Sequence, residues 1–119
     1  MPEMKTYTGG CHCGKVRYEV TTDLARVMDC NCSICSKKGH VLTFVPAEQF
    51  KLLAGADAVS MYQFNKHVVD HTFCASCGVS SYNSGRNREG VAMYAINLRC
   101  VDGVDVASLD VQHVDGKSL

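Results

Sequence analysis

Cysteine is the residue type with which this sequence is best equipped to do chemistry. Seven of its eight cysteines lie in three short clusters, which are Cys11-His12-Cys13-Gly14, Cys30-Asn31-Cys32-Ser33-Ile34-Cys35 and Cys74-Ala75-Ser76-Cys77-Gly78. An odd number of cysteines cannot all be paired in disulfides. The seven divide instead into four and three: four thiolates complete a tetrahedral Zn²⁺ site, whereas three leave its fourth position open to water or a substrate. The clusters therefore predict two zinc ions, one structural and one catalytic.

The first and third clusters together are typical of a structural zinc site. Two residues separate Cys74 from Cys77, so both sulfur atoms can turn toward one ion, and Gly78 permits the positive φ of a tight turn. Cys11 and Cys13 form a shorter pair that also ends in glycine. Each pair alone is a weak signal, because a lone CxxC also occurs as a redox dithiol. The two pairs, about sixty residues apart, predict one four-cysteine site that ties distant parts of the chain together.

The middle cluster differs because it has three thiols and no obvious fourth ligand. Cys30, Cys32 and Cys35 lie within six residues, and the nearest further candidate is His40, which we interpret as a loop or partly buried structural histidine. An open zinc lowers the pKa of bound water or a bound thiol and so creates a nucleophile at neutral pH. A substrate thiol suits a site rich in sulfur, because soft ligands favour the same metals. The alternatives are a second structural site closed by a distant residue, or three reduced thiols.

Two residues near the clusters are expected to be structural. Cys100 ends an apolar segment and is expected to be a small core residue. His12 lies between two cysteines and cannot point in the same direction as both, so we expect it at the surface or behind the ligands.

Charge and hydropathy limit the classes of partner. Lysine and arginine total 12, aspartate and glutamate also total 12, and the net charge is zero, so a whole-molecule basic field for nucleic acid or anionic membranes is absent. Residues 1–5 contain no apolar signal segment, and no apolar run approaches the roughly 20 residues of a membrane span. We expect residues 1–119 to form one domain in the reducing cytosol, where spaced cysteines indicate metal or redox sites. A secreted disulfide scaffold is the less favoured alternative.

The elements that must position the cysteines are short strands. Residues 15–20 alternate strictly, so that Val16, Tyr18 and Val20 are expected to face a core. Further strands are expected at residues 41–45, 59–64, 68–73, 78–82 and 91–98, with the second and third joined at Asn65-Lys66-His67 as a hairpin. Residues 46–50 begin with proline and predict one short helical turn, and residues 83–90 a polar loop. The sequence therefore predicts an all-β domain.

The three clusters, in this order, resemble a known family. Cys11-X-Cys13-Gly14, Cys30-X-Cys32-X-X-Cys35 and Phe73-Cys74-X-X-Cys77-Gly78 are similar to the glutathione-dependent formaldehyde-activating enzyme family, which also contains the centromere-protein-V-like domains. Further matches are Thr8-Gly9-Gly10, Asn97-Leu98-Arg99-Cys100 with Val101-Asp102-Gly103-Val104, and His113-Val114-Asp115-Gly116. The resemblance extends over residues 7–116 and includes all seven clustered cysteines.

The resemblance implies a fold, a set of ligands and a reaction. The fold consists of several coiled antiparallel β-sheets stapled by zinc, shared with a guanine-nucleotide-exchange chaperone. The resemblance assigns the structural zinc to Cys11, Cys13, Cys74 and Cys77, and the catalytic zinc to Cys30, Cys32 and Cys35. The family activity is condensation of formaldehyde with glutathione to S-hydroxymethylglutathione, classed as a carbon–sulfur lyase. In the implied mechanism, the glutathione thiol takes the open zinc position, loses its proton and attacks the aldehyde carbon.

Two functional classes remain open at this stage. The first is a zinc-dependent enzyme acting on glutathione–aldehyde adducts or a related thiol, and the second is a non-catalytic zinc-stapled β module that binds a protein partner. The three-cysteine cluster favours the enzyme, because a scaffold has no need of an unsaturated metal. Glutathione carries two carboxylates, for which Lys37, Lys38, Arg86 and Arg88 are candidate partners. Nothing in the sequence indicates an oligomeric state.

Overall fold

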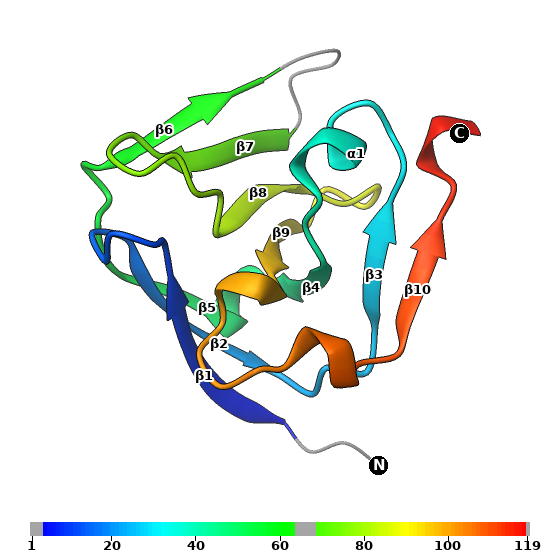
Figure 1. Ribbon diagram of the computed structural model, residues 1–119, viewed down its shortest axis with the longest axis horizontal. Coiled ribbons are helices and arrows are strands. Elements are labelled where there is room, and N and C mark those ends of the chain that lie inside the picture. Colours follow the sequence, from blue (N-terminus) through cyan, green and yellow to red (C-terminus); the bar gives the residue numbers. More distant parts are fainter. Residues whose placement is uncertain (1–3, 64–68, 119) are drawn as a thin grey trace.

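Two β-sheets make up most of the fold (Figure 1). The structure is a computed structural model that describes residues 4–63 and 69–118. The smaller sheet has the order β1-β2-β5, with β1 (Lys5–Gly10), β2 (Arg17–Thr22) and β5 (Phe50–Ala54). The larger sheet has the order β10-β3-β4-β9-β8-β7-β6. Its strands are β3 (Val27–Cys30), β4 (Leu42–Pro46), β6 (Val59–Tyr62), β7 (Val69–Cys74), β8 (Tyr82–Arg86), β9 (Ala92–Asn97) and β10 (Val111–Val114).

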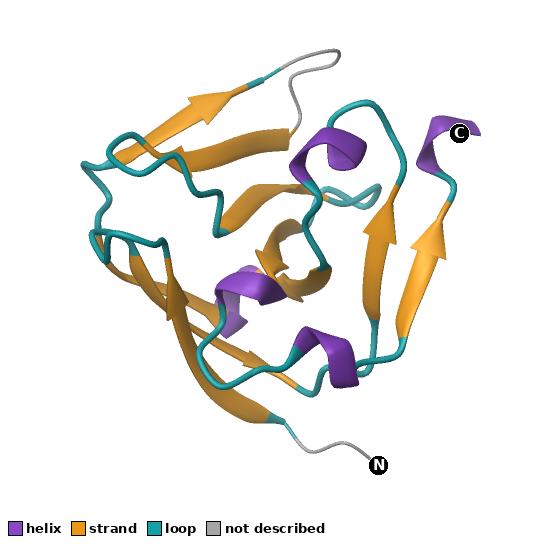
Figure 2. Cartoon of the chain, viewed as in Figure 1, coloured by secondary structure: helices purple, strands orange, loops and turns teal. Residues whose placement is uncertain are grey.

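Helical structure is limited to short pieces between the strands (Figure 2). In the described residues these are the α-helix α1 (Cys35–Lys38) and the 3₁₀ turns Ala47–Gln49, Leu98–Cys100, Val106–Ser108 and Gly116–Ser118. None of them is long and apolar enough to cross a membrane. The mainly β fold that the sequence predicts is confirmed. One pairing departs from the antiparallel expectation, because β10 runs parallel to β3.

The core lies between the two sheets and confirms the alternation predicted for residues 15–20. Val16, Tyr18 and Val20 are at most 1% exposed. The Tyr18 ring packs against Phe50, with the two ring centroids 5.3 Å apart, and Phe50 stacks on Tyr94 of the larger sheet at 4.1 Å. Burying each such side chain contributes about 1.5–3 kcal/mol relative to leaving it exposed. This aromatic contact is one of the links between the small sheet and the large one.

The boundary between the strand predicted for residues 78–82 and the loop predicted for residues 83–90 is wrong, although residues 87–90 do form a loop. Residues 78–81 form an irregular connection, and β8 runs through the first part of the segment predicted as a polar loop. The reason is that Asn83 is 4% exposed and has its partners inside the fold. Its Oδ1 accepts hydrogen bonds from the Thr72 backbone N–H at 3.2 Å and from Lys38 Nζ at 3.1 Å. A polar residue with satisfied hydrogen bonds can lie within a buried strand.

The remaining predicted elements are found close to their expected places. β6 and β7 pair antiparallel, as predicted for residues 59–64 and 68–73, although the predicted turn at Asn65-Lys66-His67 lies outside the described residues. The helical turn predicted from Pro46 is the 3₁₀ turn Ala47–Gln49. Strands β4 and β9 correspond to the predictions for residues 41–45 and 91–98.

Candidate metal centres

The first and third cysteine clusters come together as a group of four sulfur atoms. The ligand atoms of Cys11, Cys13, Cys74 and Cys77 all lie within 4.8 Å of one another. The Sγ of Cys13 is 3.6 Å from the Sγ of Cys11 and 3.6 Å from that of Cys74. Four sulfur atoms arranged tetrahedrally around zinc, with bonds of about 2.3 Å, lie about 3.8 Å from one another. The four-cysteine group therefore fits a zinc ion.

Backbone N–H groups stabilise the thiolate form of this group. The N–H of Val16 donates to Cys11 Sγ at 3.3 Å. The N–H of Val79 lowers the pKa of Cys77 to about 6, because a hydrogen bond to the charged form favours it. Gly78 has a φ of 80°, which allows the chain to turn back so that Val79 reaches the sulfur.

The four-cysteine group connects the two sheets. Cys11 and Cys13 lie in the turn between β1 and β2 of the small sheet, whereas Cys74 is the last residue of β7 in the large sheet. A further contact joins the same two turns, since Lys15 Nζ donates to Ser76 Oγ at 2.8 Å. A cation held by all four sulfur atoms would cross-link the sheets at the end opposite to the C-terminal strand pair β3–β10 (Figure 1).

The middle cluster forms a second group, the cysteine trio of Cys30, Cys32 and Cys35. Its sulfur atoms also lie within 4.8 Å of one another, and in the described parts of the chain no fourth His, Cys, Asp or Glu joins them within that distance. Cys30 ends β3 and Cys35 begins α1. Burial and the nearby sulfur atoms of Cys32 and Cys30 raise the pKa of Cys35 to about 12, so a cation must displace its proton. An ion bound here would keep an open coordination position.

His40 lies directly behind the cysteine trio. Its Nε2 is 3.2 Å from Cys35 Sγ, yet it does not belong to the group of mutually close ligand atoms. The residue is 3% exposed, and burial together with the charge of Lys38 lowers its pKa to about 4. The imidazole is therefore neutral at pH 7 and can donate Nε2–H to a Cys35 thiolate, which orients that ligand. In the sequence, the only reason to consider His40 was its closeness to the cysteine cluster along the chain.

The C-terminal strand covers the trio, which sequence reasoning did not predict. The parallel pairing places Val114 opposite Cys30, and the Asn31 N–H donates to Val114 O at 3.2 Å. Gly116 then lies against Cys30, and a Cβ added at Gly116 would clash with Cys30 Sγ. In the sequence, only the His113-Val114-Asp115-Gly116 motif indicated that this segment has a role. A motif does not show which residue its glycine contacts.

Gly116→Ala is expected to loosen the cysteine trio without affecting the four-cysteine group. The added methyl group must displace Cys30, and changes next to metal ligands commonly weaken metal binding by roughly ten- to hundredfold. The measurement is zinc content after mild chelation, together with a thermal melt. Ser118→Ala in the same 3₁₀ turn is the control, because it adds no atom beside Cys30. Metal retention equal to that of the wild type would show that the close contact has no effect on the trio.

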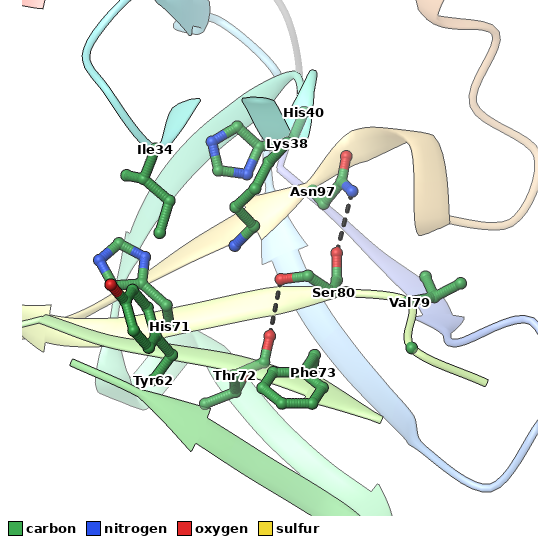
Figure 3. A pocket seen from close by; sticks show the side chains of 11 residues that line it. Ile34, Lys38, His40, Tyr62, His71, Thr72, Phe73, Val79, Ser80 and Asn97 are labelled. Atoms are coloured by element: carbon green, nitrogen blue, oxygen red, sulfur yellow. Dashed lines mark hydrogen bonds between the residues drawn. The ribbon is translucent and has the colours of Figure 1, made fainter. Parts of the chain in front are cut away.

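Two cavities adjoin the trio, and His40 lines both. The first, of about 450 Å³, includes Cys30, Cys35, Arg99 and His113 in its walls. His113 Nδ1 is paired with Asp29 Oδ1 at 2.7 Å, which holds the ring. The second, of about 460 Å³, is shown in Figure 3. Its lining residues that have polar side chains are Lys38, His40, Tyr62, His71, Thr72, Ser80 and Asn97.

The other residues singled out in the sequence lie at different distances from the trio. Lys38 lines the second cavity, whereas Lys37 is exposed next to it. Arg86 donates to Gly90 O at 2.8 Å and lines a separate groove on the large sheet, and Arg88 is exposed. The structure thus brings one of the four candidate cations to the trio. His12 is exposed, as the sequence indicated, whereas Cys100, predicted in the core, is only partly buried.

The comparisons with known proteins agree with this geometry. Residues 6–113 match the family described as glutathione-dependent formaldehyde-activating enzyme. The chain belongs to this family. The fold is also similar to the crystal structure of a Rhodobacter sphaeroides protein, with a TM-score of 0.77 and 26% sequence identity over 88% of this chain and 99% of that one. Membership in the formaldehyde-activating enzyme family supports a function of the kind for which the family is named.

Proposed function

We propose that this protein is a zinc-dependent enzyme of the S-hydroxymethylglutathione synthase type, a carbon–sulfur lyase that joins glutathione or a related thiol to an aldehyde. The observation that carries the proposal is the cysteine trio, whose three sulfur atoms have no fourth protein ligand among the described residues and border an open cavity. A site built only for structure would be closed, as the four-cysteine group is. Family membership supports glutathione and formaldehyde as the reactants.

In this proposal the two cysteine groups have different roles. Cys11, Cys13, Cys74 and Cys77 would hold a structural zinc ion, and the trio would hold the catalytic one. Zinc at the trio would lower the pKa of a thiol that reaches its open position. Two residues maintain the geometry: His40 orients Cys35 through the contact of Nε2 with Sγ, and Gly116 leaves room for Cys30.

The reaction needs one proton to move from sulfur to oxygen. The thiol sulfur forms a bond to the aldehyde carbon, the C=O π electrons move to oxygen, and the oxygen takes up a proton equivalent to the one that the thiol lost. His113 and Arg99 line the cavity beside Cys30. A histidine whose ring is held by Asp29 is suited to carry this proton. The guanidinium of Arg99 is suited to stabilise negative charge that develops on oxygen.

Reduced glutathione is expected to bind much more tightly than S-methylglutathione. A thiolate can complete a tetrahedral zinc site, whereas a thioether is a weaker, neutral donor. Because ligation displaces the thiol proton, glutathione binding should strengthen by up to about tenfold per pH unit below the thiol pKa of about 8.5. Calorimetry with both peptides at pH 6.5 and 7.5 measures both effects. Equal affinity for the two peptides would remove thiolate–zinc bonding from the mechanism.

Cys32→Ser is the control for this experiment. It removes one ligand of the trio and leaves the four-cysteine group intact, so the variant should lose the preference for glutathione over its S-methyl derivative. With formaldehyde added, the wild type should bring the spontaneous condensation to equilibrium sooner, and the variant should not. Binding by the variant that matches the wild type would place the thiol site elsewhere.

A partner-binding module is the second candidate function, and one feature favours it. The large sheet carries an apolar groove of about 250 Å³, whose lining includes Phe44, Val69 and Met93. Phe44 is 48% exposed there, and exposed apolar patches often mark interaction sites. A zinc-loaded, folded protein that binds neither peptide would favour this candidate over the enzyme.

A further inference from the structure

The second cavity contains an amino group that forms no ion pair with a carboxylate of the described residues. Lys38, the last residue of α1, is partly buried, and in Figure 3 its amino group points into the space between His71 and Ser80. Its Nζ donates to Asn83 Oδ1 at 3.1 Å. None of the ion pairs between residues of the described ranges 4–63 and 69–118 involves Lys38.

An ammonium group in this position has lost part of its solvation by water without gaining an equivalent set of interactions. Moving a charge out of water is costly unless an opposite charge or several hydrogen bonds replace the lost solvation. The acceptor of the Lys38 hydrogen bond, Asn83 Oδ1, is neutral and also accepts from the Thr72 N–H and Ser80 Oγ. Burial accordingly lowers the pKa of Lys38. An anion in the cavity would compensate for this loss of solvation.

The rest of the cavity is suited to a small, peptide-like molecule. Its volume, about 460 Å³, lies within the range of about 300–1,000 Å³ for small-molecule sites. His40 Nδ1 is buried and has no hydrogen-bond partner among the described residues. A polar group of a bound molecule could supply the missing hydrogen bond. Ile34 and Val79 supply apolar contacts.

His40 separates this cavity from the cysteine trio, whose sulfur atoms do not line it. His40 lines it and contacts Cys35. Lys38 and Cys35 lie three residues apart on α1, and side chains at this spacing are neighbours, with about 5–6 Å between their Cβ atoms. One short element therefore carries both a cysteine of the trio and the ammonium group of Lys38.

We propose that this cavity binds the carboxylate-bearing part of the thiol substrate and that Lys38 is the residue that recognises the carboxylate. The inference rests on the proposed thiol chemistry and adds the place and the residue by which this chain selects a thiol with a nearby acidic group. Lys38 forms a charge-assisted hydrogen bond with the carboxylate, which is about twice as strong as a neutral one. Lys38 is then a specificity-determining residue, because thiols without an acidic group leave its charge uncompensated.

The test compares glutathione with glutathione diethyl ester, which keeps the thiol but lacks both carboxylate charges. Calorimetry with the zinc-loaded full chain should show glutathione binding about tenfold or more tightly than the ester. Lys38→Met should remove this difference by weakening glutathione alone, and Lys38→Arg should restore part of it. Lys37→Met is the matched control, since it removes the same charge from the adjacent, exposed position and should behave as the wild type.

The outcomes separate this inference from the proposed function. Equal wild-type affinity for glutathione and its ester would overturn the role of Lys38 without the need for any variant. A Lys38→Met protein that loses affinity equally for both thiols would also overturn it, because Lys38 would then only balance the charge of the trio. In both cases the binding of both thiols by the wild type still upholds the proposed function. A wild type that binds neither thiol would overturn the function and the inference together. Zinc content and thermal melts establish that each variant is folded.

Discussion

Serine in place of Cys77 is expected to unfold the domain, whereas serine in place of Cys32 should leave it folded. The four-cysteine group connects the two sheets, and structural zinc sites in small peptides are worth about 10–16 kcal/mol. A domain of this size is stable by only about 5–15 kcal/mol, so loss of one ligand removes a large part of its stability. We expect Cys77→Ser to lower the melting temperature by roughly 15 °C or more, or to abolish the transition.

Cys13→Ser and Cys32→Ser are the matched comparisons in the same melting experiment. Cys13 belongs to the same group as Cys77, so its replacement should have the same effect. Cys32 belongs to the trio, which lies between β3 and α1 and does not join the sheets. A protein that tolerates the loss of Cys77 but unfolds without Cys32 would reverse the roles of the two groups.

Freshly purified protein is expected to contain close to two zinc ions per chain, one of which mild chelation removes far sooner. A complete cage of four thiolates releases its ion only by local unfolding, whereas a site with three ligands exchanges through its open position. Burial does not separate the two groups, because Cys11 and Cys74 are buried but Cys13 is exposed, and all three cysteines of the trio are partly buried. The number of ligands is therefore the basis of the expected difference. Metal analysis before and after incubation with chelator measures the difference.

Simultaneous loss of both ions would contradict the division into a structural and a catalytic site. The Cys32→Ser protein provides the reference for this measurement. It should contain close to one zinc ion from the start, and that ion should resist the chelator as the slower one of the wild type does.

The sequence by itself determined the features that depend on residues close together in the chain. The alternation of Val16, Tyr18 and Val20 placed β2 correctly, because a strand exposes successive side chains to opposite faces. The CxxC spacing of Cys74 and Cys77 likewise predicted a turn that presents two sulfur atoms to one point. The number and order of the cysteines led to the formaldehyde-activating enzyme family, which the match over residues 6–113 confirms.

Predictions from local sequence patterns were wrong where a residue interacts with a segment distant in the chain. Residues 78–82 were predicted as a strand, but the backbone of Val79 is part of the turn around Cys77, where its N–H lowers the pKa of that thiol. Asn83 suggested a loop by its polarity, but its amide oxygen is satisfied by Thr72 and Lys38. The polarity and shape of a side chain indicate which secondary structure the residue favours. They do not show which residue of a distant segment will form a hydrogen bond with it.

Only the tertiary structure decided what surrounds the trio. The parallel pairing of β10 with β3 joins residues more than eighty positions apart, Val114 and Cys30, and so brings Gly116 onto a sulfur atom. The fold also directs His40 onto Cys35 and places Lys38, but not Lys37, in the wall of the second cavity. Such contacts arise from the competition of all strands for burial and hydrogen bonds. The cysteine spacing therefore predicted which residues form the trio, while the residues that surround the trio, such as Gly116 and His40, emerged only with the packed sheets.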